Sequence, residues 1–370
     1  MTERHVVVVK IGSSSLVDEH GRLDGAFLDR FAAQIAALAK AGKRPVLVTS
    51  GAVASGIGIL GLKQRPPGIS ERQALAAIGQ ASLAHRWQAA LLARGLVAAQ
   101  VLLTNDDFTE RSRYLNLTAA FRALFAYGAV PVINENDTVA VDELTVGDND
   151  RLSAMVATQL GAELLVLLTD IDGVYDADPR GNPDATLIRD MDGVSPALLK
   201  AAGAAGGLGR GGMRSKLEAA RLAGGAGIPT VIAPARAPDV LTRILAREAV
   251  GTRVAPRGKA TDGRRRWLAM ARTVHGRLTL DTGAAEAVAR DGRSLLPAGI
   301  VAVSGRFERG DTVAIVDPHG DEIARGLAEL SSVELERVAG KKLDAAAREL
   351  GYALPKTAIH RDNMLVLVRR

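Results

Sequence analysis

The first 255 residues alternate short runs of β-branched residues with longer segments that have one apolar face. Residues 5–11 read HVVVVKI, a continuous apolar run typical of a strand buried on both faces of a sheet. Residues 24–41 place Phe27, Phe31, Ile35 and Leu38 at the spacing of one buried helix face. The two patterns recur and predict strands at 45–49, 96–103, 129–133, 163–168 and 229–233, and helices at 70–94, 111–127, 151–160 and 213–223. This alternation predicts an α/β fold with an open, mostly parallel sheet sandwiched by helices.

The pattern changes between residues 250 and 266, where Pro256, Gly258, Gly263 and three successive arginines interrupt the alternation. Beyond this point the apolar runs are short and are separated by turn residues. They predict strands at 276–280, 299–304, 312–316 and 322–326, and helices at 282–291 and 331–339. We therefore expect a first domain over 1–255, a linker over 256–272 and a second, small β-rich domain over 273–370.

Composition excludes several classes of protein. The 370 residues include no cysteine, which excludes disulfides, thiol catalysis and cysteine-ligated metals. No apolar run approaches the roughly 20 residues that span a bilayer, and the N-terminal residues lack a secretory pattern. We expect a cytoplasmic protein that makes no membrane contact.

Net charge gives weak evidence about partners. The formal charge is +6, and residues 256–370 carry +5 of it, with 20 Lys and Arg against 15 Asp and Glu. A surplus of this size fits a solvated linker at least as well as a nucleic-acid surface. Aromatic residues make up only 3% of the chain, which argues against an extended base-stacking platform.

The segment 134–150 is the most polar of the predicted strand ends. It reads NENDTVAVDELTVGDND and holds six carboxylates and three asparagines with no Lys or Arg. In an open parallel sheet, ligands bind beyond the carboxyl ends of the strands. The segment therefore predicts a pocket for a ligand that carries an amine, with a solvated acidic loop as the alternative.

Glycine-rich turns at two other places predict phosphate binding. Lys10 is followed by Gly12 at the end of the first strand, and Gly211-Gly212 precede a predicted helix that contains Lys216. Glycine lets backbone N–H groups approach phosphate oxygens, and a helix N-terminus favours negative charge. The two lysines could then flank a triphosphate.

Familiar nucleotide and metal motifs are missing or misplaced. The sequence has no G-x-x-x-x-G-K-[ST], no H-R-D catalytic loop and no H-E-x-x-H. Residues 56–61 spell G-x-G-x-x-G but lie well past their strand, so they do not predict a dinucleotide site. The six histidines show no ligand spacing. We expect no protein-bound metal site.

These features together suggest phosphoryl transfer, which depends mainly on positioning and on neutralising charge. An alcohol acceptor would need a general base. A carboxylate acceptor would need none, because it is already an anion, and the obstacle would be repulsion between two anions. Lys10, Lys216 and Mg²⁺ could relieve that repulsion.

Six segments resemble one known family over nearly the whole chain. They are VVKIGSSSL (8–16), VTSGAVASG (48–56), PVINENDTV (131–139), VGDNDRLSA (146–154), LLTDIDGVYDADPR (167–180) and GGMRSKLEAA (211–220), with SLLPAGI (294–300) and IHRDNML (359–365) matching a tail module. The chain resembles the glutamate 5-kinases, amino acid kinases with a C-terminal PUA domain. The pairing of NEND with GDND is what separates this resemblance from aspartate, acetylglutamate and uridylate kinases.

The resemblance implies ATP-dependent phosphorylation of the side-chain carboxylate of L-glutamate to L-glutamyl 5-phosphate, the first step of proline biosynthesis. It implies Lys10, Lys216 and Asp150 as catalytic residues, with Asp150 orienting the two lysines. The implied ATP-binding residues are Lys10, Gly12, Thr169, Asp170, Arg210, Gly211, Gly212, Met213, Arg214, Ser215 and Lys216. The implied glutamate-binding residues are Ser50, Gly51, Asn134, Asp137 and Asn149, with Asp137 suited to the α-ammonium group.

The chain departs from the family pattern at three positions. Ser13 and Ser215 stand where threonine is usual and keep the hydroxyl, whereas Arg210 adds a charge near the nucleotide. The resemblance also implies ATP and Mg²⁺ as cofactors, a homo-oligomer (dimer or tetramer), feedback inhibition by proline and contact with a downstream glutamyl phosphate reductase. The alternatives are a sister kinase acting on aspartate or acetylglutamate and an RNA-binding protein that acts through its PUA domain.

Overall fold

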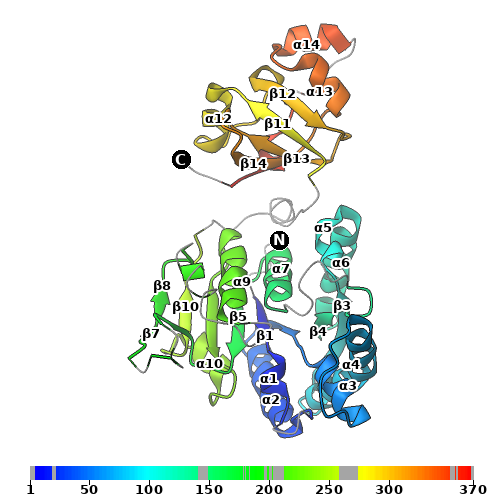
Figure 1. Ribbon diagram of the computed structural model, residues 1–370, viewed down its shortest axis with the longest axis vertical. Helices are drawn as coiled ribbons and strands as arrows, with labels where there is room; N and C mark the ends of the chain where they lie inside the picture. The colour runs from blue at the N-terminus through cyan, green and yellow to red at the C-terminus, as the bar shows by residue number, and fades with distance from the viewer. Residues whose placement is uncertain are drawn as a thin grey trace. The chain divides into compact units, whose positions relative to one another are not determined.

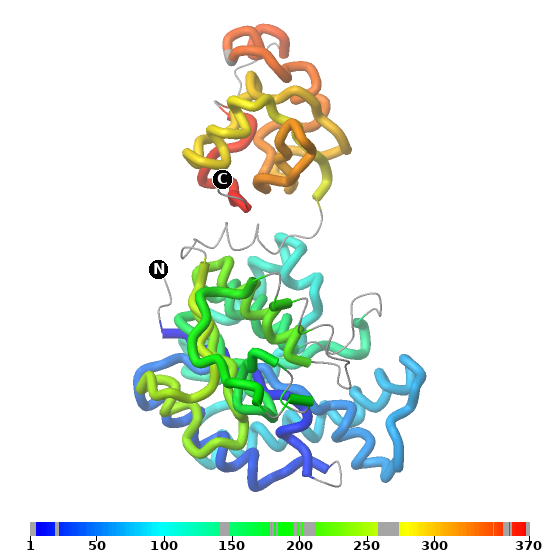
Figure 2. The backbone as a smooth tube through the Cα atoms, turned by 60° about the vertical axis from the view of Figure 1, so that its left-hand side comes forward, coloured from blue at the N-terminus to red at the C-terminus, as the bar shows by residue number. Residues whose placement is uncertain are grey.

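The chain folds into two compact units, and each has its own hydrophobic core (Figures 1 and 2). The first unit comprises Met1–Asp107 with Ser112–Thr261, and the second comprises Phe108–Arg111 with Asp262–Arg370. The computed structural model describes residues 5–18, 22–140, 149–177, 179, 181–182, 184–195, 198–199, 202, 212–257, 274–350, 355 and 357–367. Most of the predicted linker, 256–272, lies outside these residues.

The first unit is built on an eight-stranded sheet with the order β3-β4-β2-β1-β5-β9-β10-β8. The strands are β1 (Val6–Lys10), β2 (Arg44–Val48), β3 (Val97–Leu103), β4 (Ala129–Glu135), β5 (Leu164–Thr169), β8 (Asp190–Met191), β9 (Thr230–Pro234) and β10 (Thr252–Val254). Every neighbouring pair is parallel except β9 and β10. The predicted α/β fold with a mostly parallel sheet is confirmed.

Helices cover both faces of this sheet. On one face lie α2 (Gly25–Lys40), α4 (Ile69–Leu92) and α10 (Val240–Leu245), which share a core with alternate strand residues such as Val7 and Val9. On the other face α7 (Asn149–Leu160) and α9 (Met213–Gly225) lie side by side (Figure 1). The other described elements of this unit are α1 (Ser13–Leu16), α3 (Ala52–Leu60), most of α6 (Arg111–Ala126) and the hairpin of β6 (Val174–Tyr175) and β7 (Leu187–Ile188). The residues of α5 (Asp106–Thr109) are divided between the two units.

Helices α3 and α4 cross at two glycines. A Cβ on Gly79 would lie 1.9 Å from the carbonyl oxygen of Ala52, and a Cβ on Gly56 would lie 2.1 Å from that of Leu75. Only glycine allows the two backbones to come this close. Gly61, with a φ of 64°, ends α3 in the left-handed conformation. Helix packing and helix termination thus account for Gly56 and Gly61, two of the glycines of the G-x-G-x-x-G spelling.

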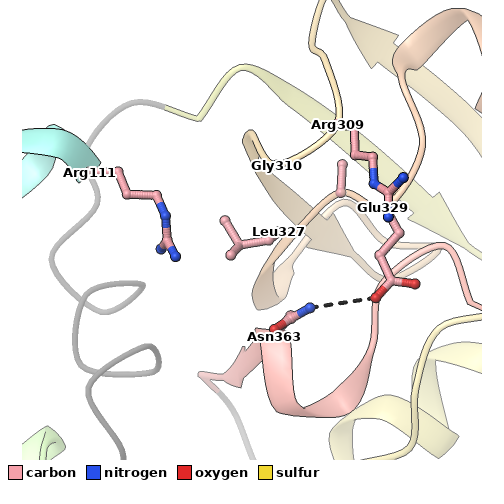
Figure 3. A pocket seen from close by; sticks show the side chains of 7 residues that line it. Arg111, Arg309, Gly310, Leu327, Glu329 and Asn363 are labelled. Carbon is pink, nitrogen blue, oxygen red and sulfur yellow. Dashed lines mark hydrogen bonds between the residues drawn. The ribbon is translucent and has the colours of Figure 1, made fainter. Parts of the chain in front are cut away.

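The second unit is a small mixed sheet with short helices, as predicted. Its order is β12-β11-β13-β14-β15, and only the β11–β13 pair is parallel. Figure 3 shows a hydrogen bond in this unit from the Asn363 amide to Glu329, which also accepts one from the Thr357 hydroxyl. The elements are β11 (Gly276–Leu280), α12 (Thr282–Ala289), β12 (Ile300–Gly305), β13 (Thr312–Val316), β14 (Glu322–Leu327), α13 (Ser332–Val338), α14 (Leu343–Leu350) and β15 (Met364–Val366), with 3₁₀ turns at Pro297–Gly299 and Arg361–Asn363.

None of the helices in the described part of the chain is long and apolar enough to cross a membrane.

Candidate active site

The predicted strand-end loops meet at one edge of the sheet. Lys10, the last residue of β1, pairs with Val48 of β2 on one side and with Leu167 of β5 on the other. Because these strands are parallel, the residues that follow them emerge at the same edge. Ser50, Asn134 and Thr169 therefore lie around the end of β1.

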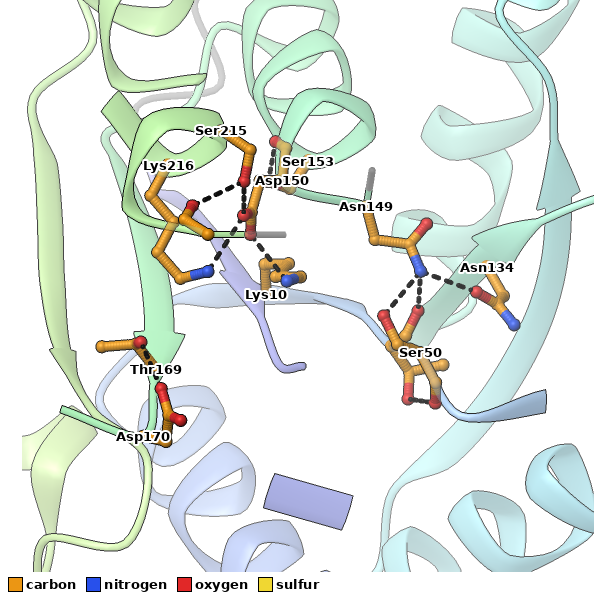
Figure 4. Close-up of polar contacts among 12 residues, drawn as sticks. Lys10, Ser50, Asn134, Asn149, Asp150, Ser153, Thr169, Asp170, Ser215 and Lys216 are labelled. Atoms are coloured by element: carbon orange, nitrogen blue, oxygen red, sulfur yellow. Dashed lines mark hydrogen bonds and ion pairs between the residues drawn. The ribbon is translucent and has the colours of Figure 1, made fainter. Parts of the chain in front are cut away.

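Two lysines share one buried aspartate at this edge (Figure 4). The Nζ atom of Lys10 lies 2.6 Å from Oδ1 of Asp150, and that of Lys216 lies 3.0 Å from Oδ2. The hydroxyl of Ser215 also donates to Oδ2, at 2.7 Å. Each lysine is only 5% exposed and Asp150 is fully buried. Among the contacts of the described residues, two ammonium groups thus share one carboxylate.

This cluster keeps Asp150 ionised. Burial by itself would raise the pKa of Asp150, because the charged form loses its water. The charges of Lys10 and Lys216, with the hydrogen bonds from Lys10 and Ser215, outweigh burial and lower the pKa below its ordinary value. Asp150 is thus a permanent anion that holds both ammonium groups in place.

Local structure explains how the three residues meet. Side chains alternate along a strand, so Lys10 points to the face opposite Val7 and Val9, where α7 and α9 lie. Lys216 stands in the first turn of α9, behind Gly212. Helix α7 begins at Asn149, two residues before the predicted start at Arg151. The early start brings Asn149 and Asp150 into the helix instead of the preceding loop.

A second, neutral cluster lies beside the first (Figure 4). The Nδ2 atom of Asn149 donates to the backbone oxygen of Thr49 at 2.8 Å, to Oγ of Ser50 at 2.7 Å and to Oδ1 of Asn134 at 3.0 Å. Asn134 and Asn149 are both buried. The Oδ1 atom of Asn149 is buried and has no hydrogen-bond partner among the described residues. A buried acceptor of this kind carries a desolvation cost unless a ligand provides a donor.

Two glycines at the strand ends leave room next to these clusters. A Cβ on Gly12 would lie 3.7 Å from the Nζ atom of Lys10. Gly51 has a φ of 102° and precedes α3, a conformation that favours glycine. Both glycines lie where their backbone could approach a ligand at the end of β1.

Asp137 lies in the turn that follows β4. It is half-buried, and burial raises its pKa to about 6, with the charge of Arg65 acting in the opposite direction. No hydrogen bond links it to Ser50, Asn134 or Asn149 in the part of the chain that the structure describes. Asp137 thus belongs to the same strand end as Asn134 but stands outside the amide cluster.

The predicted nucleotide side is only partly described. The Thr169 hydroxyl donates to Asp170 at 3.1 Å at the end of β5 (Figure 4). Met213, Arg214 and Ser215 form the first turn of α9, and Arg214 pairs with Glu218 on its surface. Arg210 and Gly211 lie outside the described residues. In the described ranges no group of three His, Asp or Glu side chains could hold a metal ion.

Two residues of α4 contribute to this edge and were not predicted. Gln80 accepts a hydrogen bond from Nδ2 of Asn134 at 2.8 Å, and the indole of Trp87 donates to the Thr49 hydroxyl at 3.0 Å. Their spacing of seven residues puts both on one helix face, where Gln80 is a polar residue among Ala76, Leu83 and Trp87. That exception to an apolar face is the one feature of the sequence that could have identified Gln80. No comparable feature of the sequence indicates that the charge of Arg65 acts on Asp137.

The arrangement combines a cationic cluster with a neutral amide cluster at one strand edge. The cationic cluster can bind an anion and stabilise charge that develops on it, since buried cations act strongly in a site of low dielectric constant. The amide cluster can orient a polar, uncharged or zwitterionic group. This combination suits transfer of an anionic group between two ligands.

Comparison with known proteins identifies the family. The amino acid kinase family matches residues 5–234, and the PUA domain matches residues 276–350. A glutamate 5-kinase from Pseudomonas syringae pv. tomato is 48% identical over 361 residues, which cover 97% of each chain. A glutamate 5-kinase from Pseudomonas savastanoi pv. phaseolicola is 47% identical over 99% of this chain and all of that one. An isopentenyl phosphate kinase structure has a TM-score of 0.49 and 20% identity, covering 68% of this chain and 100% of its own. The chain belongs to the amino acid kinase family.

Proposed function

We propose that the chain transfers the terminal phosphoryl group of ATP to the side-chain carboxylate of L-glutamate, forming L-glutamyl 5-phosphate, as in the first step of proline biosynthesis. The observation that carries this proposal is the pair of buried ammonium groups held by Asp150 beside the amide cluster. Full-length relatives named glutamate 5-kinase, at 47–48% identity, support the choice of substrate.

The reaction depends more on neutralising the negative charges of the two reactants than on transferring a proton. A carboxylate at neutral pH is already the nucleophile, so no general base is required. Lys10 and Lys216 neutralise the repulsion between the acceptor carboxylate and the phosphate oxygens. Asp150 would hold the two ammonium groups in place, because it forms an ion pair with each of them. Gly12 and Gly51 would place backbone N–H groups near the phosphoryl group while it is transferred.

Glutamate is proposed to bind at the ends of β2 and β4. Ser50, Asn134 and Asn149 would orient its polar groups, and the ionised form of Asp137 would pair with its α-ammonium group. The nucleotide would lie on the opposite side of β1, along Thr169, Asp170 and the first turn of α9.

Mg²⁺ is proposed to enter with the nucleotide. The described residues provide no acidic cluster for it, and Mg²⁺ commonly binds through substrate phosphates with few protein ligands. No protein residue is therefore assigned as its ligand.

The two-unit organisation suggests a division of labour. We place catalysis in residues 1–255, where the amino acid kinase family matches, and assign a regulatory or assembly role to residues 273–370, which contain the PUA match. By resemblance to the glutamate 5-kinases we also propose a cytoplasmic homo-oligomer that proline inhibits and that passes its product to glutamyl phosphate reductase.

Trapping the acyl phosphate tests the proposal. Hydroxylamine converts an acyl phosphate to a hydroxamate, so ATP, Mg²⁺ and glutamate should yield glutamyl hydroxamate with wild-type protein. Lys10→Ala should abolish turnover while the protein remains folded, because the charge acts mainly in the transition state. Hydroxamate from aspartate or acetylglutamate but not from glutamate would assign the chain to a sister kinase instead.

A further inference from the structure

Helix α4 is linked to the proposed substrate end of the sheet by a hydrogen bond of one glutamine. Gln80 is half-buried, and its Oε1 atom accepts from Nδ2 of Asn134, whose Oδ1 atom accepts from Nδ2 of Asn149. Three amides therefore form a chain of hydrogen bonds from the helix to the site. Gln80 is the member farthest from the ammonium cluster.

The direction of this chain is set by the backbone. The carbonyl oxygen of Thr49 can only accept, so the Asn149 amide must turn its Nδ2 towards it. Asn134 must then present Oδ1 to Asn149 and Nδ2 to the helix. Only an acceptor at position 80 satisfies that Nδ2 group, and Gln80 provides it.

Trp87 holds Thr49, the residue at which the chain of hydrogen bonds starts. Its indole N–H can only donate, and it donates to the Thr49 hydroxyl from a fully buried position. Seven residues separate Trp87 from Gln80, so one face of α4 holds both the carbonyl end and the acceptor end of the chain. The indole is itself held by an edge contact with Phe31, 6.2 Å between ring centres.

This chain of hydrogen bonds determines the position of Asn149 Oδ1, the atom without a partner. Three acceptors surround the Nδ2 group of Asn149, and its buried Oδ1 has no hydrogen-bond partner among the described residues, so it can accept from a ligand. An acceptor in that position suits the N–H groups of an ammonium-bearing substrate. If Asn134 lost its partner on the helix, its amide could rotate, and Asn149 would lose one of the three acceptors that hold its Nδ2 group.

We propose that Gln80 is a positioning residue for the acceptor substrate: it orients Asn134, and through it Asn149, so that Asn149 Oδ1 is presented to the substrate's ammonium group. Gln80 acts without touching the substrate. The inference rests on the proposed function, because it takes the amide cluster as the glutamate site.

Gln80→Met is the direct test, since methionine keeps the length of the side chain and removes the acceptor. A cavity of about 210 Å³ on one side of Gln80, lined also by Leu83, Gln88 and Gln100, leaves room for the new side chain. Losing a hydrogen bond worth about 0.5–1.5 kcal/mol should raise the KM for glutamate about two- to twelvefold. kcat and the KM for ATP should stay within about twofold, and the melting temperature should fall only by the few degrees that one unpaired buried donor costs.

Three controls separate positioning from general destabilisation. Gln80→Glu keeps an acceptor at this position, so its KM for glutamate should stay close to the wild-type value. Gln88→Met changes the same residue type in the same helix and cavity and should leave all constants unchanged. In an Asn134→Ala background, Gln80→Met should add no further increase in KM, because the chain is already broken.

The outcomes distinguish the two proposals. If wild-type protein phosphorylates glutamate and Gln80→Met leaves its KM unchanged, or raises both substrate KM values together with a lower melting temperature, the positioning role is wrong and the function stands. If the wild type phosphorylates a different amino acid, the proposed function is wrong, and the same KM series on that acceptor decides the role of Gln80.

Discussion

One carboxylate holds two ammonium groups at the end of β1, and this arrangement decides what each residue contributes. Asp150 is fully buried, so removing a single lysine leaves the other still paired and the local charge close to balanced. Removing Asp150 would instead leave two buried cations without their counter-ion, a strongly destabilising change. The lysines are therefore the informative positions for testing catalysis.

Lys216→Met should reduce kcat by about 100- to 1000-fold, because it removes one preorganised charge from the transition state. The KM for glutamate should change little, since Lys216 comes from α9, away from the amide cluster. Initial rates of hydroxamate formation measure both constants.

Lys43→Met is the matched control for that substitution. Lys43 pairs with Glu163 at 2.7 Å, and both residues precede their strands, at the opposite edge of the sheet. Its loss should leave kcat unchanged. Equal losses of activity in the two variants would contradict a catalytic role for Lys216.

Asp137 should make glutamate binding depend on pH. Its pKa is raised to about 6 by burial, so it is ionised at pH 7 and mostly protonated at pH 5. Only the ionised form attracts an ammonium group. The value of kcat/KM for glutamate should therefore fall about tenfold between pH 7 and pH 5, with an inflection near pH 6, because this ratio reports groups of the free enzyme.

Asp137→Asn identifies the group responsible. The variant should have a low, nearly flat profile over the same range, since its amide does not titrate. An inflection near pH 6 that persists in this variant would assign the titration to a different residue.

At the scale of elements, the α3–α4 crossing links packing to the site. Helix α3 starts directly after Ser50 and Gly51, and Gly79 of α4 lies against its first turns. Moving the two helices apart would therefore shift the end of β2, where the amide cluster forms.

Gly79→Ala should destabilise the first unit by about 1–3 kcal/mol, because a Cβ there has no space. The KM for glutamate should rise as well, as α3 moves. Thermal unfolding and steady-state kinetics measure the two effects.

Gly225→Ala is the same substitution at a helical glycine with nothing within 4 Å of the new Cβ. It should be neutral or stabilise by up to about 1 kcal/mol, as expected from helix propensity. A Gly79→Ala variant that behaves like Gly225→Ala would show that the helices are not in close contact.

The sequence predicted the elements whose pattern is local and missed those that depend on distant contacts. The six longer strands of the large sheet and the larger helices are recognisable because their apolar spacing is continuous over enough residues. Helix α3 was not predicted, because its sequence AVASGIGIL is rich in glycine and its stability comes from packing on α4. Strands β8 and β10 are two and three residues long, too short for any periodicity.

In the site, too, residues with a local sequence signal could be predicted and residues that depend on distant contacts could not. Lys10 and Lys216 could be proposed because each stands beside a strand end or a glycine turn, whereas the role of Asp150 was implied by the resemblance to the glutamate 5-kinases. Gln80 and Trp87 are in the middle of a long helix, and the residues next to them in the sequence do not indicate that they bind Asn134 and Thr49. Only the crossing of α4 over the ends of β2 and β4 brings them there.

At the scale of the whole molecule, two separate cores predict two separable unfolding steps. Calorimetry of the full chain should show two transitions. An ATP analogue with glutamate should raise only the transition of the first unit, because ligand stabilises the unit that binds it.

Core substitutions assign the transitions. Leu38→Ala, in the first core, should lower one transition, and Leu335→Ala, in the second, should lower the other, each by about 2–5 kcal/mol of stability. A single transition that both substitutions shift equally would mean that the units unfold together.

The two ammonium groups lie more than 200 positions apart along the polypeptide, one in the first strand and the other in α9. A nascent chain has no complete reaction centre until the ribosome has made α9. Cutting the gene anywhere between α7 and α9 would give two inert fragments, each lacking one of the cations. Reassembly of such fragments would restore turnover, which makes this fold a natural starting point for a split-enzyme reporter.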